Sequence, residues 1–89
     1  MLTRGKVLGF EYNRMVVQFT MMDGYTDVPC AISTDALDRL DPDFKIVLSQ
    51  REVQFMRLRD RIEMKVQEKF RKKETEGKPP GIVLRVTDF

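Results

Sequence analysis

Few side chains in this sequence could carry out acid–base or nucleophilic chemistry. Among its 89 residues there is no histidine, which is the usual proton carrier near neutral pH and the commonest zinc ligand. The one cysteine, Cys30, excludes an intramolecular disulfide and a cysteine metal cluster. Its alternation with Val28 and Ile32 predicts a buried, inert thiol. No catalytic, cofactor-binding or metal-binding residue is expected, and the chain is predicted not to be an enzyme.

Arg59 is the charged side chain whose position most needs an explanation. At about 100° per residue, a helix places it within an apolar stripe that contains Phe55 and Ile62. A guanidinium in such a stripe is costly unless it is paired. Two interpretations are open. The first is a structural ion pair or a snorkelling side chain, with Asp88 or Asp35 as the partner. The second is a site for an anionic ligand or for the carboxylate of a partner.

One flank of the same helix carries a ridge of basic side chains. Residues 57–73 include eight cationic and three anionic side chains, so this face could attract nucleic acid or an acidic partner. The alternative is a solvated outer face that keeps a small domain soluble. Glu68 lies on the same flank and dilutes the positive charge. The candidate polyanion-binding face consists of Arg57, Arg61, Lys65, Lys69 and Lys72.

A second apolar set lies on the side of this helix that faces away from the main stripe. It consists of Val53, Met56 and Met64. Methionines are common in adaptable contact surfaces, so the set indicates a homodimer contact or a surface for a protein partner. The alternative is that the connector over residues 44–48 folds over Val53 and Met56.

The strands that position these residues are predicted from alternating apolar side chains. Residues 6–32 are expected to form three antiparallel strands, with a two-residue turn at Asp23-Gly24. Leu8, Phe10 and Tyr12 are predicted to share one face of the first strand. A fourth strand is predicted over residues 82–87.

Two helices are predicted between the third strand and the last. Ser33 suits the N-cap of a short helix that stops at Asp41-Pro42. Ser49 and Glu52 have the spacing of a capping box that opens a helix reaching to about residue 73. Apolar residues form one stripe along this long helix, and it must cover the sheet: Phe55, Leu58, Ile62, Val66 and Phe70.

The predicted fold is α+β, a two-layer sandwich with an antiparallel four-stranded sheet in the order β-β-β-α-α-β. One short and one long helix are expected on one face of the sheet. Pro29 lacks an amide hydrogen, so the third strand is expected at an edge or with a bulge. The predicted strand order is therefore 4-1-2-3.

A series of short, mostly apolar pieces spans nearly the whole chain: Phe19, Val28-Pro29-Cys30-Ala31-Ile32-Ser33, Ala36, Leu37, Leu40, Phe55, Arg59, Ile62, Val66, Phe70, Asp88 and Phe89. In these residues the chain resembles the bacterial domain of unknown function family 1488, a family of small stand-alone proteins. Relatives often have a small residue near Val66 and a tyrosine at Phe70. The resemblance implies a small α+β domain and no known activity, so no catalytic or binding residue can be carried over.

Length and composition limit the class of protein further. A chain of 89 residues suits one domain over residues 1–89, since a second core would need roughly 50 more residues. At 42% apolar and 34% charged residues, it is neither a disordered tail nor a membrane span. The N-terminal residues lack the apolar core of a secretion signal, so a cytoplasmic location is expected. We expect a small non-catalytic accessory or protein-interaction domain; the alternative is a nucleic-acid-associated module that uses the basic face.

Overall fold

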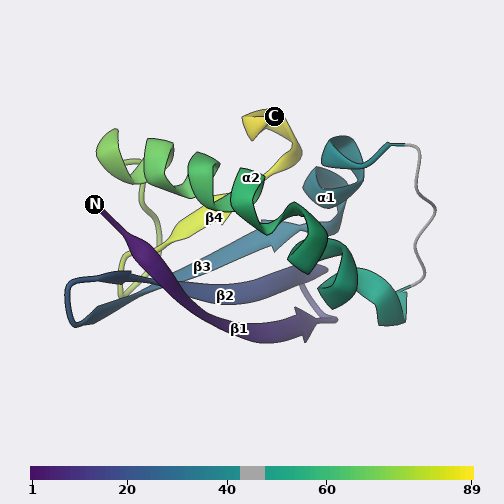
Figure 1. Cartoon of the computed structure of the whole chain (residues 1–89), viewed down its shortest axis with the longest axis horizontal. Coiled ribbons are helices and arrows are strands. Elements are labelled where there is room, and N and C mark those ends of the chain that lie inside the picture. Colours follow the sequence, from purple (N-terminus) through teal and green to yellow (C-terminus); the bar gives the residue numbers. More distant parts are fainter. Residues whose placement is uncertain (43–47) are drawn as a thin grey trace.

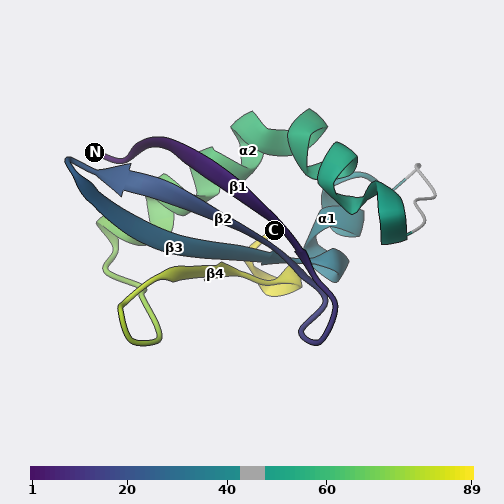
Figure 2. The same cartoon turned by 90° about the horizontal axis from the view of Figure 1, so that it is seen from below.

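The computed structural model describes residues 1–42 and 48–89. A four-stranded sheet forms one layer, and two helices pack against one of its faces (Figures 1 and 2). This confirms the predicted α+β class and the order of the elements. The elements are β1 (Thr3–Glu11), β2 (Val16–Asp23), β3 (Thr26–Ser33), α1 (Thr34–Leu40), the 3-10 turn η1 (Leu48–Gln50), α2 (Arg51–Arg71), β4 (Ile82–Leu84) and the 3-10 turn η2 (Val86–Asp88).

The sheet is mixed rather than antiparallel, and its strand order is β1-β2-β3-β4. The predicted order 4-1-2-3 is wrong, because β4 pairs in parallel with β3, from Cys30↔Ile82 to Ile32↔Leu84. Pro29 therefore lies in a central strand, and its register with β2 runs without a bulge. A missing amide hydrogen matters only where a neighbouring strand needs it. The pairing with β4 starts one residue after Pro29, so the proline lies beyond that short ladder.

The predicted shared face of Leu8, Phe10 and Tyr12 is wrong for Leu8 because β1 is bulged, whereas the rings of Phe10 and Tyr12 lie in contact, 5.6 Å apart between centroids. The register of β1 with β2 shifts twice, between Arg4 and Val7 and between Val7 and Gly9. An extra residue reverses the alternation of side chains, so Val7 and Phe10, three positions apart, both pack against the core. Leu8 is left 62% exposed on the other face. Gly9 has φ +120°, which side-chain-bearing residues rarely adopt.

The hairpin between β2 and β3 turns one residue later than predicted. Asp23 pairs with Thr26, so Gly24 and Tyr25 are the two turn residues. Only Gly24 has a positive φ, of 63°. A type I′ turn needs positive φ at both positions, whereas a glycine at the first position alone is typical of type II′.

The ends of the helices are closed in different ways. Ser33 caps α1 as predicted, since its hydroxyl oxygen accepts the amide of Ala36 at 3.1 Å. The predicted capping box at Ser49 is wrong: Ser49 lies in η1, and α2 starts after Gln50 with no side-chain cap. The amide of Glu74 bonds to the carbonyl of Lys69 beyond the last turn of α2. This bond closes the C-terminus near the predicted residue 73.

The chain after Leu84 does not continue as the predicted strand. The amide of Arg85 donates to the carboxylate of Asp88 at 2.7 Å, and the chain turns into η2. Packing of the connector over residues 44–48 was also predicted, but those side chains lie outside the described residues. Within the described ranges, no helix is both long and apolar enough to cross a membrane.

The core lies between α2 and the inner face of the sheet, as the apolar stripe predicts. Phe55, Ile62 and Val66 of α2 are fully buried, and Leu58 is nearly so. The ring of Phe55 lies 4.9 Å from that of Phe19 in β2, measured between centroids. α1 adds Ala36 and Leu37 to the same core, where both are fully buried.

We expect Ile62→Val to lower the free energy of unfolding by about 0.5–1.5 kcal/mol and Ile62→Ala by about 2–5 kcal/mol, because each leaves a cavity beneath α2. Urea denaturation followed by circular dichroism measures both values. The control, Tyr25→Ala at the exposed hairpin, should change the free energy of unfolding by no more than about 0.5 kcal/mol. Equal effects of the three substitutions would contradict the packing described above.

Candidate functional site

Arg59 is held by structural partners on α2 and β1. Its side chain is only 12% exposed and its Nε lies 3.0 Å from Glu63. Its Nη2 donates to the carbonyl of Gly5 at 3.1 Å. The predicted partners Asp88 and Asp35 are wrong, because Arg59 points toward the β1 edge of the sheet. The arginine therefore covers part of an edge strand and ties it to α2.

Asp88 lies at the opposite edge of the sheet and pairs with Lys69. The Nζ of Lys69 lies 3.1 Å from the Asp88 carboxylate and donates to the carbonyl of Val83 at 3.0 Å. Lys69 is 9% exposed, so its predicted place on a polyanion-binding face is wrong. On a helical wheel it is next to Ile62, on the flank that faces β4. It links the C-terminal turn to the core rather than to solvent.

The other members of the predicted polyanion-binding face lie on the surface and are engaged in local pairs. Arg57 pairs with Asp41, and Arg61 donates to the carbonyl of Leu40. Lys65 and Lys72 both pair with Glu68, at 3.2 Å each. Their hydrogen bonds hold the pKa of Glu68 below its ordinary value. The face is thus a network of mixed charge.

Sequence reasoning missed a buried polar network between α1 and α2. Arg51 pairs with Asp38 at 2.6 Å and donates to the side chain of Gln54 at 2.8 Å. Arg51 and Gln54 are both buried. The signal was present in the spacing, because Arg51 lies four residues before Phe55 and seven before Leu58, on the apolar stripe.

The residues predicted to form a partner surface, Val53, Met56 and Met64, are all exposed on the outer side of α2. Met64 is 71% exposed and stands between two hollows. The N-terminal hollow, of about 840 Å³, is lined by Met1, Met64, Gln67, Phe70, Arg71, Lys73 and Thr75. The C-terminal hollow, of about 350 Å³, is lined by Leu40, Arg61, Met64, Lys65, Glu68, Arg71 and Phe89.

The two hollows share an apolar floor and a basic rim, and we refer to them together with Met64 as the Met64 surface. Gln67 hydrogen-bonds the backbone of Leu2, which ties the start of the chain to α2. Cations on the rim outnumber the one carboxylate, Glu68. In the described part of the chain, Arg71 and Lys73 make no ion pair or hydrogen bond through their side chains. The rim cations are Arg61, Lys65, Arg71 and Lys73.

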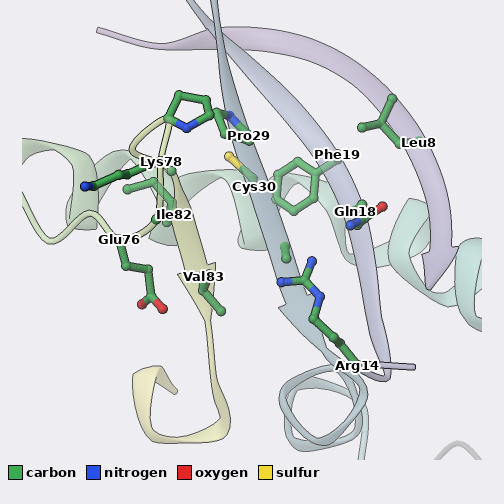
Figure 3. A pocket seen from close by; sticks show the side chains of 14 residues that line it. Leu8, Arg14, Gln18, Phe19, Pro29, Cys30, Glu76, Lys78, Ile82 and Val83 are labelled. Carbon is green, nitrogen blue, oxygen red and sulfur yellow. The ribbon is translucent and has the colours of Figure 1, made fainter. Parts of the chain in front are cut away.

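The face of the sheet opposite the helices carries a separate groove of about 360 Å³. Figure 3 shows it between β4 on one side and Leu8 on the other, with Arg14 reaching in from the β1–β2 turn. Cys30 contributes no nucleophile, since burial raises the pKa of its thiol to about 12. We call this hollow the open-face groove.

Comparison with known proteins identifies a family and a fold. The family model "Protein of unknown function (DUF1488)" matches residues 7–81. A crystal structure of a protein of unknown function from the DUF1488 family of Shewanella loihica PV-4 is similar, with a TM-score of 0.80 and 17% sequence identity. The similarity covers 94% of this chain and 92% of that one. At this identity it shows a shared fold. No curated protein sequence matches significantly.

We expect Arg51→Met to flatten the loss of stability on acidification. The hydrogen bond from Arg51 holds the pKa of Asp38 below its ordinary value, which is about 3.9. A carboxyl whose pKa is lower in the folded state stabilises the fold fully above the unfolded pKa, and this contribution is lost as the pH falls through the folded pKa.

Urea midpoints measured from about pH 6 down to about pH 2 test this expectation. Asp38→Asn is the matched variant, because it removes the titrating group and keeps Arg51. Both variants should show a shallower acid slope than the parent protein. A parental slope in Arg51→Met would mean that this pair does not contribute to acid sensitivity.

Proposed function

This chain belongs to the DUF1488 family of proteins of unknown function, and we propose that it is a small non-catalytic module that binds a protein partner through the Met64 surface. The segment bound would be amphipathic, with apolar residues on one side and acidic residues beside them. The cytoplasm, expected from the sequence, is the compartment in which we propose that it acts.

The exposure of Met64 between two hollows is the observation that carries this proposal. A soluble protein gains nothing in stability from a large apolar side chain in water, and clustered exposed apolar residues commonly mark interaction sites. Methionine is unbranched and polarisable, so it adapts to the shape of a partner. Val53 and Met56 are also exposed, on the N-terminal half of α2.

The charge of the rim defines the chemistry of the partner. Four cations surround the Met64 surface and one carboxylate opposes them. An acidic segment would therefore be attracted to it and oriented by it. A helix that lays its apolar face into a groove, with acidic residues on its flanks, fits both features.

The same charges argue against a second copy of this chain as the occupant. A twofold-symmetric contact sets the same patch against itself, and it would bring the rim cations of both copies together. Like charges in apposition disfavour an interface. A homodimer through this surface is thus the first competing outcome of the test.

Nucleic acid is the second competing outcome. The basic ridge on α2 led to this prediction, but one of its members, Lys69, is buried. Lys65 and Lys72 both pair with Glu68. Duplex DNA attracts unopposed rows of cations, whereas the carboxylates of Asp41 and Glu68 pair with three cations of this ridge. An acidic protein segment needs only the cations around the two hollows.

We expect a photo-crosslinking amino acid at Met64 to capture a protein whose crosslinked segment is apolar and acidic. A synthetic peptide of that segment should bind the purified protein, and the binding should weaken as salt is raised. Met64→Glu should reduce the affinity about tenfold or more, because it places a carboxylate against an acidic, apolar ligand. Crosslinking identifies the segment, and fluorescence anisotropy measures its affinity.

The matched control places the crosslinker, and separately a glutamate, at Tyr25, a fully exposed residue of the β2–β3 hairpin that lines neither hollow. Neither change should capture the segment or affect peptide binding. The proposal would be overturned by crosslinks from Met64 that join only two copies of this chain, by crosslinks to nucleic acid removed by nuclease, or by equal effects of the two glutamates.

A further inference from the structure

We propose that the open-face groove is a binding site for a single carboxylate carried on a short aliphatic body, and that Arg14 anchors the carboxylate. This site is separate from the Met64 surface, because it lies on the opposite side of the sheet from α2 (Figures 1 and 3). The inference does not depend on the proposed function.

Arg14 is held in place at one end of its guanidinium and is open at the other. Its Nε donates to the carboxylate of Glu11 at 2.8 Å. Its two terminal amino groups make no hydrogen bond within the described residues, and Figure 3 shows the guanidinium pointing into the groove. Two parallel N–H donors on one planar group are the geometry that a carboxylate accepts in a bidentate pair.

Gln18 supplies a second polar group beside Arg14. It lies on β2, on the face opposite Val17 and Phe19, and lines the same groove. Its side-chain amide has no hydrogen-bond partner among the described residues, so it is available to a ligand. An amide donor next to a fixed guanidinium suits the second oxygen of a carboxylate.

The groove has a positive balance of charge. Glu11 is matched by Arg14, and Glu76 receives two hydrogen bonds from Arg85, at 2.7 and 2.8 Å. Lys78 lines the groove without an ion pair in the described part of the chain. With both carboxylates matched and one cation left over, the groove favours an anion.

The rest of the lining is aliphatic and small. Ala31 lies between Gln18 of β2 and Val83 of β4 in the sheet register, so the floor has a methyl group where neighbouring rows have longer side chains. Leu8, Pro29, Pro79 and Val83 contribute apolar walls.

The lining also sets the size and kind of the apolar body. Among the described residues, Phe19 is the one aromatic residue in the lining, and its ring is buried in the core against Phe55. A base or another aromatic ring would therefore find no aromatic side chain to stack on there. About 360 Å³ is at the small end of ligand sites. These features fit an aliphatic chain of a few carbon atoms.

Two kinds of molecule carry this chemistry: a free aliphatic acid, and the C-terminal residue of a peptide that ends in an aliphatic side chain. 4-Methylpentanoate serves as the probe for the first, and acetyl-Gly-Leu with a free carboxylate as the probe for the second. The amides of the two compounds are matched controls that lack the charge.

Titration of the ¹⁵N-labelled protein, followed by amide chemical shifts, tests the proposal. We expect one or both acids to shift the backbone amide resonances of Gln18, Ala31 and Val83 in a saturable way. The uncharged amide derivatives of the two compounds should leave these resonances unchanged. The acid that binds more tightly identifies the source. Arg14→Gln should weaken binding about tenfold or more, since it removes the charged hydrogen bonds.

Lys6→Gln is the matched control variant, because it removes one positive charge from exposed β1 outside the groove. It should retain the parental affinity, as should Met64→Glu. The proposal would be overturned if neither acid shifted these backbone resonances at millimolar concentration, or if the uncharged derivatives bound as well as the acids. Equal weakening of binding by Arg14→Gln and Lys6→Gln would also overturn it. Failure here would leave the Met64 surface untouched, because its test uses a different ligand and a different variant.

Discussion

The burial of one stripe of α2 against the inner face of the sheet is the interaction on which the rest of the structure depends. Phe55, Ile62 and Val66 are fully buried there, and α2 contacts β1, β2 and β4. Most of the stability of a protein helix comes from such packing rather than from its own propensity. Once this stripe is buried, the outer side of α2 and the far face of the sheet are the two broad surfaces left to solvent (Figures 1 and 2).

Local patterns in the sequence predicted most helices and strands correctly. They did not predict which strands pair when the strands are distant in sequence. The Ser33 cap and the stripe on α2 depend on residues a few positions apart, so periodicity reveals them. The parallel pairing of β4 with β3 depends on how the chain returns after α2, which no local pattern encodes. The bulges in β1 likewise appear only against β2, and they reverse the faces that simple alternation assigns to Leu8 and Phe10.

For the charged residues too, the sequence predicts the position on the helix but not the partner in the ion pair. A helical wheel correctly placed Arg59 in the apolar stripe, but the nearest carboxylate, Glu63, is one turn further along the same helix. Lys69 and Arg51 also fall within the stripe on the wheel, and both are buried with an acidic partner from another segment. Long cationic side chains in such positions bury their stems and carry the charge to a partner. The partner depends on the fold, so the sequence alone could not identify it.

A two-layer fold keeps the Met64 surface and the open-face groove apart. The first is built on the outer side of α2 and the second on the outer side of the sheet, with the apolar core between them. Arg14 comes from the turn between β1 and β2, and none of the residues that the structure describes lines both surfaces. The two surfaces adjoin along the chain after α2, because Thr75 lines the N-terminal hollow and the next residue, Glu76, lines the open-face groove. Any coupling between them can therefore run through this segment as well as through the closely packed core, which resists continuous deformation.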